Sequence, residues 1–266
     1  TLFNLHLYFQ QNSQYDKFDN KNTIEWAKQN QLLTSPDIWL LSKLQKLIQI
    51  LTEKNQTCKF HEGAKAIDDF IINNLSQIYI PITRGELWDE DEEKKNRRLS
   101  IYAVLSEVLK TLDILIHPFC PFTSEHLYQT VFSGKQSILL DKWPSYQESL
   151  VNEEIEESFD IMKDVVSISS AARMKGKLKR RWPLNEAQIC VKKGQKVKLE
   201  SLSELLQSQL NVEKFRIIET EKNSGLEQVL ELKRLVLTVK VIFELEIKSI
   251  PQGSSTSSVT NSILTP

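Results

Sequence analysis

Cysteine, glycine, proline and long apolar runs are all scarce in this chain, and each scarcity narrows the class of protein. The three cysteines, Cys58, Cys120 and Cys190, are scattered and odd in number, which argues against a disulfide framework and favours a reducing compartment. No apolar run approaches the roughly 20 residues that span a bilayer. Residues 1–10 also lack the basic region and cleavage site of a signal peptide. We therefore predict a cytoplasmic location and no membrane partner.

The low content of glycine and proline favours helix. Only 7 glycines and 8 prolines occur among 266 residues, whereas Leu, Ile, Lys, Glu and Gln are frequent. A chain of this length suits two domains better than one core. It has no initiator Met and opens within an apolar helical pattern. We therefore expect a segment of a longer protein, whose chemistry can lie outside it.

Apolar residues recur at spacings of three and four from residue 1 to about residue 116, which predicts amphipathic helices. Ser35-Pro36-Asp37 is a strong helix start, with an N-cap hydroxyl, a proline in the first turn and then an acid. Three helices are expected to bury one apolar face each, formed by Leu40, Leu44, Leu47 and Leu51, by Ile67, Ile71, Leu75, Ile78 and Ile82, and by Ile101, Leu105, Val108, Leu112 and Leu115. These spacings predict a mainly α fold, an antiparallel helical bundle over residues 1–147.

The pattern changes after the bundle and predicts a small α+β domain. We assign residues 148–184 to a connecting helix and a basic junction, residues 185–250 to a small α/β domain, and residues 251–266 to a flexible tail rich in serine. Apolar spacings predict a strand, a helix and two further strands in that domain, at residues 187–191, 199–210, 215–218 and 237–247.

The strongest functional signal is the run from Arg173 to Arg181, RMKGKLKRR, which Trp182 follows directly. Six of its nine positions are basic and none is acidic, in a chain of formal net charge -1. A solvated helix face would normally mix in acids, so we favour contact with a polyanion over that alternative. Cations neutralise phosphates and an indole stacks on an unpaired base, which together indicate RNA. The predicted RNA-binding residues are Arg173, Lys175, Lys177, Lys179, Arg180, Arg181 and Trp182, with Arg173 or Trp182 expected against a base.

A second charged stretch, DEDEEKKNRR at residues 89–98, is expected to be mainly a helix entry, because acids favour the first turn of a helix. Contact of its bases with a backbone phosphate is the less favoured alternative, through Lys94, Lys95, Arg97 and Arg98. The tryptophans outside the basic run are expected to be core anchors rather than stacking platforms: Trp26, Trp39, Trp88 and Trp143.

Metal-binding and catalytic patterns are missing. His117, Cys120 and His126 lie close together, but a structural zinc site needs four ligands, and no Cys-x-x-Cys pair exists here. We expect them to pack in the core and bind no metal. Neither a Gly-rich phosphate loop nor a recognisable Ser/His/Asp arrangement occurs. The residues therefore predict a chain that binds rather than catalyses, with no cofactor of its own.

Several short motifs follow one another in order: TLFN at 1–4, DIWLLSKL at 37–44, LW at 87–88, HPFCPF at 117–122, WP at 143–144 and ARMKGKLKRRWPL at 172–184. Together they resemble the class I aminoacyl-tRNA synthetases for branched aliphatic amino acids. The isoleucyl enzymes of the archaeal and eukaryotic type are the most similar. Both catalytic signatures of that class, the His-Ile-Gly-His type and the Lys-Met-Ser-Lys-Ser type, are absent from this chain. The paired cysteines of the bacterial zinc module are absent too.

This resemblance implies an anticodon-binding helical bundle of the class I type. The longer enzyme would activate isoleucine with ATP and Mg²⁺ and esterify it to its tRNA. The partners implied are the anticodon stem-loop of isoleucine tRNA and the catalytic domain of the same chain. Two alternatives stay open: a fragment of a valyl-type synthetase, and a non-catalytic helical module that docks an acidic protein through the basic run.

Overall fold

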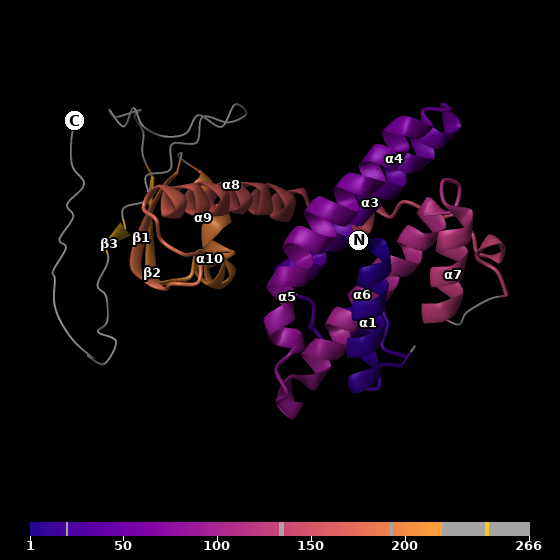
Figure 1. The fold of residues 1–266 in the computed structure, drawn as a ribbon, viewed down its shortest axis with the longest axis horizontal. Helices are drawn as coiled ribbons and strands as arrows, with labels where there is room; N and C mark the ends of the chain where they lie inside the picture. The colour runs from indigo at the N-terminus through magenta and orange to yellow at the C-terminus, as the bar shows by residue number, and fades with distance from the viewer. Residues whose placement is uncertain (20, 133–135, 192–193, 220–242, 245–266) are drawn as a thin grey trace.

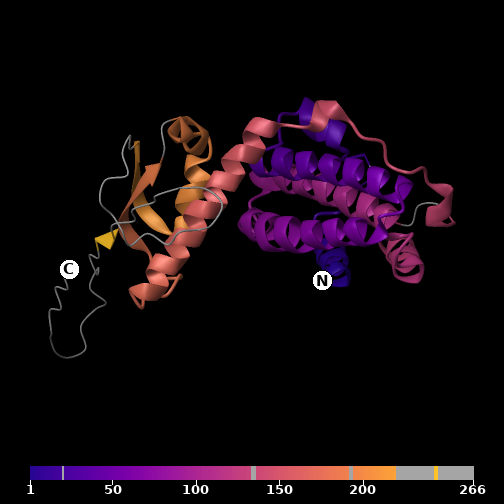
Figure 2. The same ribbon diagram turned by 90° about the horizontal axis from the view of Figure 1, so that it is seen from above.

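A computed structural model describes residues 1–19, 21–132, 136–191, 194–219 and 243–244 of the chain. A helical bundle and a small α/β unit lie side by side, and one long helix, α8, runs from the bundle into the small unit (Figures 1 and 2). This arrangement confirms the predicted fold class of a mainly α bundle followed by a small α+β domain. None of the helices in the described ranges is long and apolar enough to cross a membrane.

The bundle is built on two long central helices, α3 (Ser35–Gln56) and α6 (Lys95–Ile116). The other elements of this part are α1 (Leu2–Tyr15), α2 (Ile24–Gln29), α4 (Phe60–Asp69), η1 (Phe70–Tyr79), α5 (Ile80–Leu87), η2 (Glu92–Lys94), α7 (Pro121–Phe132), η3 (Ile138–Leu140) and η4 (Glu148–Leu150). Helix α3 starts where the sequence predicts, but its N-cap is Thr34 and not Ser35. The Thr34 N–H donates to the Asp37 carboxylate at 2.8 Å and so fixes the first turn.

The continuous helical stretch α4–η1–α5 contains a π-helix, and its buried residues show why. Besides Phe70 and Ile80, they include a row at steps of four: Ile67, Ile71, Leu75, Tyr79, Thr83 and Leu87. An α-helix turns about 100° per residue, so each step of four overshoots a full turn by about 40°. The wider turns of η1 absorb this drift and keep the row on the core. Ile78 and Ile82, predicted on the buried face, are therefore only partly buried.

A buried ion pair ties the end of α1 to the start of α6. The Arg98 guanidinium donates two hydrogen bonds of 2.9 Å to the Asp16 carboxylate, and the Tyr102 hydroxyl donates a third. Burial alone would raise the pKa of the Asp16 carboxyl, but these hydrogen bonds outweigh it and hold the pKa below its ordinary value of 3.8.

The ion pair of Asp16 with Arg98 is expected to make a pH-dependent contribution to stability. A carboxyl with a lowered pKa stabilises the fold above its ordinary pKa, and this contribution is lost as the pH falls through the lowered value. The unfolding free energies of the unaltered chain and of Asp16→Asn should therefore differ most above about pH 5 and converge in stronger acid. Urea titrations at pH 7 and pH 3 measure this, and a difference that does not change with pH would contradict it.

Helix α8 (Glu153–Lys175) joins the two parts, and its first half is anchored on the bundle. The buried Glu156 accepts from Lys43 at 2.7 Å and from Lys46 at 2.9 Å, both on α3. One turn later the Phe159 ring stacks on Trp39, with ring centroids 4.7 Å apart. The second half of α8 contacts the helices of the small unit. Because the first half of α8 is anchored on α3, the position of the C-terminal end of α8 relative to the bundle is fixed as well.

The small unit has a parallel strand pair covered by helices. Strands β1 (Leu184–Val191) and β2 (Val212–Glu219) pair in parallel, and β3 (Phe243–Glu244) pairs with the other edge of β1. The helices α9 (Gln195–Glu200) and α10 (Ser203–Leu210) connect β1 to β2 and pack with α8. The strands predicted at 187–191 and 215–218 are confirmed, and the helix predicted at 199–210 is divided into two.

Some expectations lie beyond the described part of the chain. Of the strand predicted at residues 237–247, only the two residues of β3 are described, and the tail at residues 251–266 lies outside. The domain bounds assigned from the sequence stay predictions.

Candidate nucleic-acid interface

The basic run begins inside α8 and continues as a folded loop. Helix α8 ends at Lys175, and Lys177 then takes a left-handed φ of 53°. The Leu178 N–H donates to Arg173 O at 2.9 Å and the Lys177 N–H to Met174 O at 3.1 Å. This pair of hydrogen bonds is the Schellman ending of a helix, and it turns the chain back toward α8. Residues 176–182, hereafter the basic loop, therefore have a defined conformation.

Arg173 organises the basic loop from inside. Its side chain is buried, and its guanidinium donates to the carbonyls of Trp182 at 2.8 Å and Lys179 at 3.3 Å. It also donates to the carbonyls of Leu210 at 2.9 Å and Asn211 at 3.1 Å, where α10 gives way to β2. Burial lowers the pKa of Arg173, as does the nearby charge of Arg180.

This position corrects one predicted site residue. Arg173 was expected to stack on or hydrogen-bond to an RNA base, but its guanidinium faces the interior and binds backbone carbonyls. Its place in the structure fits a positioning role for the loop rather than a contact with RNA.

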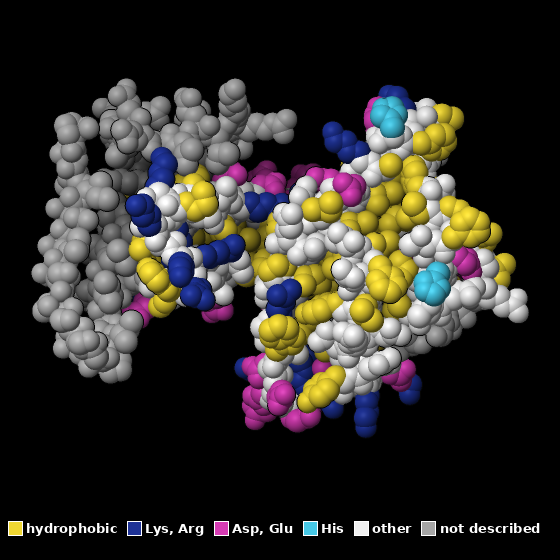
Figure 3. Space-filling model, viewed as in Figure 1, with side chains coloured by type: hydrophobic (Ala, Val, Ile, Leu, Met, Phe, Trp, Pro, Cys, Tyr) yellow, Lys and Arg dark blue, Asp and Glu magenta, His cyan; other side chains and the backbone are white. Residues whose placement is uncertain are grey.

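The other predicted residues all point outward. Lys175, Lys177, Lys179, Arg180 and Arg181 are exposed, and none has an acidic side chain within ion-pair distance among the described residues. Figure 3 shows a gathering of Lys and Arg side chains on this face of the small unit. Such a cluster of unneutralised cations repels itself and attracts an anion with many charges.

Trp182 lies within this cluster of cations. Its indole is 46% exposed, and the Lys179 ammonium sits 5.8 Å from the ring centroid. A cation at that distance attracts the face of the indole, while part of the ring stays exposed. The structure thus brings an exposed aromatic ring together with five exposed cations, four in the basic loop and Lys175 at the end of α8. Cations and an aromatic platform are the combination that binds single-stranded RNA.

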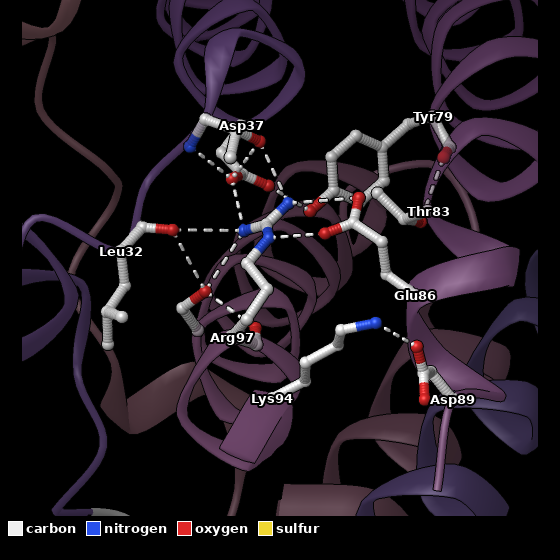
Figure 4. Close-up of polar contacts among 10 residues, drawn as sticks. Leu32, Asp37, Tyr79, Thr83, Glu86, Asp89, Lys94 and Arg97 are labelled. Atoms are coloured by element: carbon white, nitrogen blue, oxygen red, sulfur yellow. Dashed lines mark hydrogen bonds and ion pairs between the residues drawn. The ribbon is translucent and has the colours of Figure 1, made fainter. Parts of the chain in front are cut away.

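The second basic stretch, residues 89–98, makes contacts within the bundle, shown in Figure 4. Arg97 donates to the buried Asp37 carboxylate at 2.6 Å and to Glu86 at 2.6 Å. The Tyr79 hydroxyl donates to the same Asp37 at 2.7 Å, and burial together with that carboxylate raises the pKa of Tyr79. Burial opposes the charge of Arg97, but the two carboxylates outweigh it and raise the pKa of the guanidinium.

Arg97 and Arg98 are therefore committed to carboxylates inside the bundle, and Lys94 pairs with Asp89 at 2.5 Å. The less favoured alternative from the sequence, contact with a phosphate, therefore does not fit Arg97 and Arg98. For Lys94 and Lys95, which lie on the surface in ion pairs with Asp89 and Glu92, it stays a prediction. The stretch forms the entry of α6, as the favoured prediction holds, but its acids lie in η2 and the residues before it and not in the first turn of α6.

The tryptophans outside the basic run divide into two groups. Trp39 is fully buried, as predicted, and Trp26 is partly buried. Trp88 is 64% exposed and Trp143 is 37% exposed, so the prediction of a core anchor is wrong for both. No group of three or more His, Cys, Asp or Glu side chains in the described ranges could hold a metal ion.

Comparison with known proteins identifies the family. The sequence pattern of the anticodon-binding domain of tRNA ligases matches residues 37–189, more than half of the chain, and the chain belongs to this family. The match runs from α3 to β1, so it includes α8 and the basic loop.

The relatives specify the family further and confirm the resemblance found in the sequence. The isoleucine–tRNA ligase of Sulfolobus acidocaldarius is 34% identical over 66% of this chain, and that of Pyrococcus furiosus is 31% identical over 78%. The isoleucine–tRNA ligase of Methanothrix thermoacetophila is 29% identical over 70%. The aligned region covers 17%, 19% and 18% of these three relatives, so the chain spans under a fifth of their length.

Proposed function

We propose that this chain is the part of an isoleucine–tRNA ligase that binds the anticodon arm of isoleucine tRNA. The observation that carries the proposal is the exposed indole of Trp182 among five exposed and unneutralised cations, four in the basic loop and Lys175 at the end of α8. The longer enzyme would work in the cytoplasm, activate isoleucine with ATP and Mg²⁺, and esterify it to the tRNA. ATP and Mg²⁺ would be bound by its catalytic domain, the partner of this segment within the same chain.

The chemistry of the loop suits an anticodon loop better than a regular RNA stem. Side chains cannot read the deep, narrow major groove of A-form RNA, whereas an anticodon loop offers unstacked bases. Lys175, Lys177, Lys179, Arg180 and Arg181 neutralise phosphates, and Trp182 stacks on one base. Correct binding here would orient the distant acceptor end, so this segment would contribute to catalysis through positioning.

The direct test is fluorescence anisotropy with isoleucine tRNA at several salt concentrations. Five phosphate contacts should give a log–log slope of about three to four, since each contact contributes about 0.7 for single-stranded RNA. Isoleucine tRNA with substituted anticodon bases, and valine tRNA, serve as competitors. Weaker binding of both supports the proposal. Tighter binding of valine tRNA favours the valyl-type alternative, and equal binding of all three means that this segment holds only the RNA backbone. No binding even at low salt would favour a protein-docking module.

Removing two loop cations should weaken binding in a characteristic way. We expect Arg180→Ala/Arg181→Ala to lower tRNA affinity on the order of tenfold and to reduce the salt slope by about 1.4, because two phosphate contacts are lost. The matched control is Lys59→Ala/Lys65→Ala, which removes two exposed cations at the far end of the bundle, near the start of α4. An unchanged slope in the loop variant, or an equal fall in the control, would contradict the proposal.

A further inference from the structure

Trp88 stands at the C-terminal end of α5, and its exposure calls for an explanation. Its neighbour Leu87 is buried, but the indole itself is 64% exposed, more than that of Trp182 at 46%. A large apolar ring left in water forgoes the stabilisation that burial would give it. Exposed aromatic rings of this kind are frequent at binding sites.

A cation is fixed beside this indole, as in the basic loop. The Arg84 guanidinium lies 5.6 Å from the Trp88 ring centroid, close to the 5.8 Å between Lys179 and Trp182. It also lies next to the Tyr8 hydroxyl, where burial raises the pKa of Tyr8 and the charge of Arg84 opposes the rise. Among the described residues, no acidic side chain is within ion-pair distance of Arg84.

The position of α5 makes this pair relevant to the basic loop. Both ribbon views place α5 at the edge of the bundle nearer the small unit (Figures 1 and 2). In the space-filling view an open notch separates that edge from the small unit, whose face carries the Lys and Arg side chains (Figure 3). A ligand that grips the basic loop can therefore extend across the notch toward the end of α5.

The residues that follow Trp88 restrict what part of an RNA can bind there. Asp89 pairs with Lys94 and Glu92 pairs with Lys95, but Glu90 and Glu93 stay exposed without such a partner among the described residues. These carboxylates disfavour a phosphate at this end of α5. A base carries no such charge and can stack on the indole, with Arg84 available to its edge or to a hydroxyl of the sugar.

We infer that Arg84 and Trp88 form a second RNA contact, an indole platform on which one unpaired base stacks while the basic loop holds the phosphates. This inference rests on the proposed function, because the same RNA occupies both places. It adds a point of base recognition on the bundle at Trp88, a residue that the sequence analysis predicts in the core.

The test compares Trp88→Ala with variants of the loop in the tRNA anisotropy titration. Trp88→Ala should lower the affinity about tenfold or more while leaving the salt slope unchanged, because a stacked indole releases no counterions. The matched control is Phe60→Ala, which removes another exposed aromatic ring at the opposite end of the α4–η1–α5 stretch. It should bind tRNA as the unaltered chain does.

A spectroscopic measurement separates stacking from an indirect effect. In a Trp182→Phe background, tRNA should quench part of the remaining tryptophan fluorescence, and the additional change Trp88→Phe should abolish that part. Unchanged affinity of Trp88→Ala, alongside weakened binding by Arg180→Ala/Arg181→Ala, overturns the platform and leaves the proposed function standing. No tRNA binding by the unaltered chain overturns both.

Discussion

Replacing Arg97 by Leu is expected to lower the free energy of unfolding by about 3–5 kcal/mol, because it leaves a buried carboxylate without its counter-charge. Asp37 is fully buried and receives the Arg97 guanidinium at 2.6 Å. The same guanidinium joins Thr34 at 2.8 Å and Leu32 O at 3.2 Å, so one side chain connects the start of α3, the preceding loop and α6 (Figure 4). Urea unfolding followed by far-UV circular dichroism measures the loss.

Two companion variants make this measurement specific. Lys94→Leu removes the exposed ion pair with Asp89, three residues away, and should change the unfolding free energy by less than about 1 kcal/mol. Arg97→Leu combined with Asp37→Asn removes the stranded charge and should recover part of the stability. A loss below 1 kcal/mol in Arg97→Leu alone would show that Asp37 is satisfied without the guanidinium.

The sequence predicts where cations are concentrated but not which of them are exposed. Arg97, Arg98 and Arg173 all lie in basic stretches, yet the structure buries Arg98 and Arg173 and partly buries Arg97. Their partners are distant in sequence: Asp37 is 60 residues from Arg97, Asp16 is 82 from Arg98, and Leu210 is 37 from Arg173. Local charge counting cannot detect such partners. A planar guanidinium with five donors suits interior hydrogen bonding better than an ammonium, but the exposed Arg180 and Arg181 show that residue type alone does not decide.

Helical periodicity predicted the bundle because spacings of three and four are local. It failed at Ile78, which lies inside the π-helix η1, and at Ile82, which lies in α5 directly after it, since the π-helix shifts the buried row for the residues that follow. The sequence did contain a sign of the π-helix. The residues of the buried row are spaced at steps of four, and an α-helix cannot keep such a row on one side. Trp88 was misassigned for a different reason. It follows the last turn of α5, where the chain leaves the core, and tryptophan is common both in cores and at binding surfaces.

Replacing Arg173 by Met should abolish most of the affinity for tRNA, although the Arg173 side chain is buried and would not contact the RNA itself. The carbonyls of Trp182 and Leu210 would lose the guanidinium as a donor. Those of Lys179 and Asn211 would lose it too, but they keep the backbone N–H groups of Trp182 and Leu184 as donors. Each buried carbonyl left without a partner costs about 1–3 kcal/mol, so the basic loop would give up its conformation to reach water. The exposed cations would then have to be ordered during binding, and that ordering lowers affinity.

Arg173→Lys tests whether geometry or charge matters at this position. Lysine keeps the charge but has three donors on one nitrogen, and it cannot reproduce the planar fork that reaches four carbonyls. We expect it to bind tRNA almost as weakly as Arg173→Met. Hydrogen exchange at the amides of Leu178, Trp182 and Leu184 should accelerate in both variants, while amides of α3 and α6 stay protected. Full binding by Arg173→Lys would instead mean that the charge itself acts on the RNA, as the sequence alone suggests.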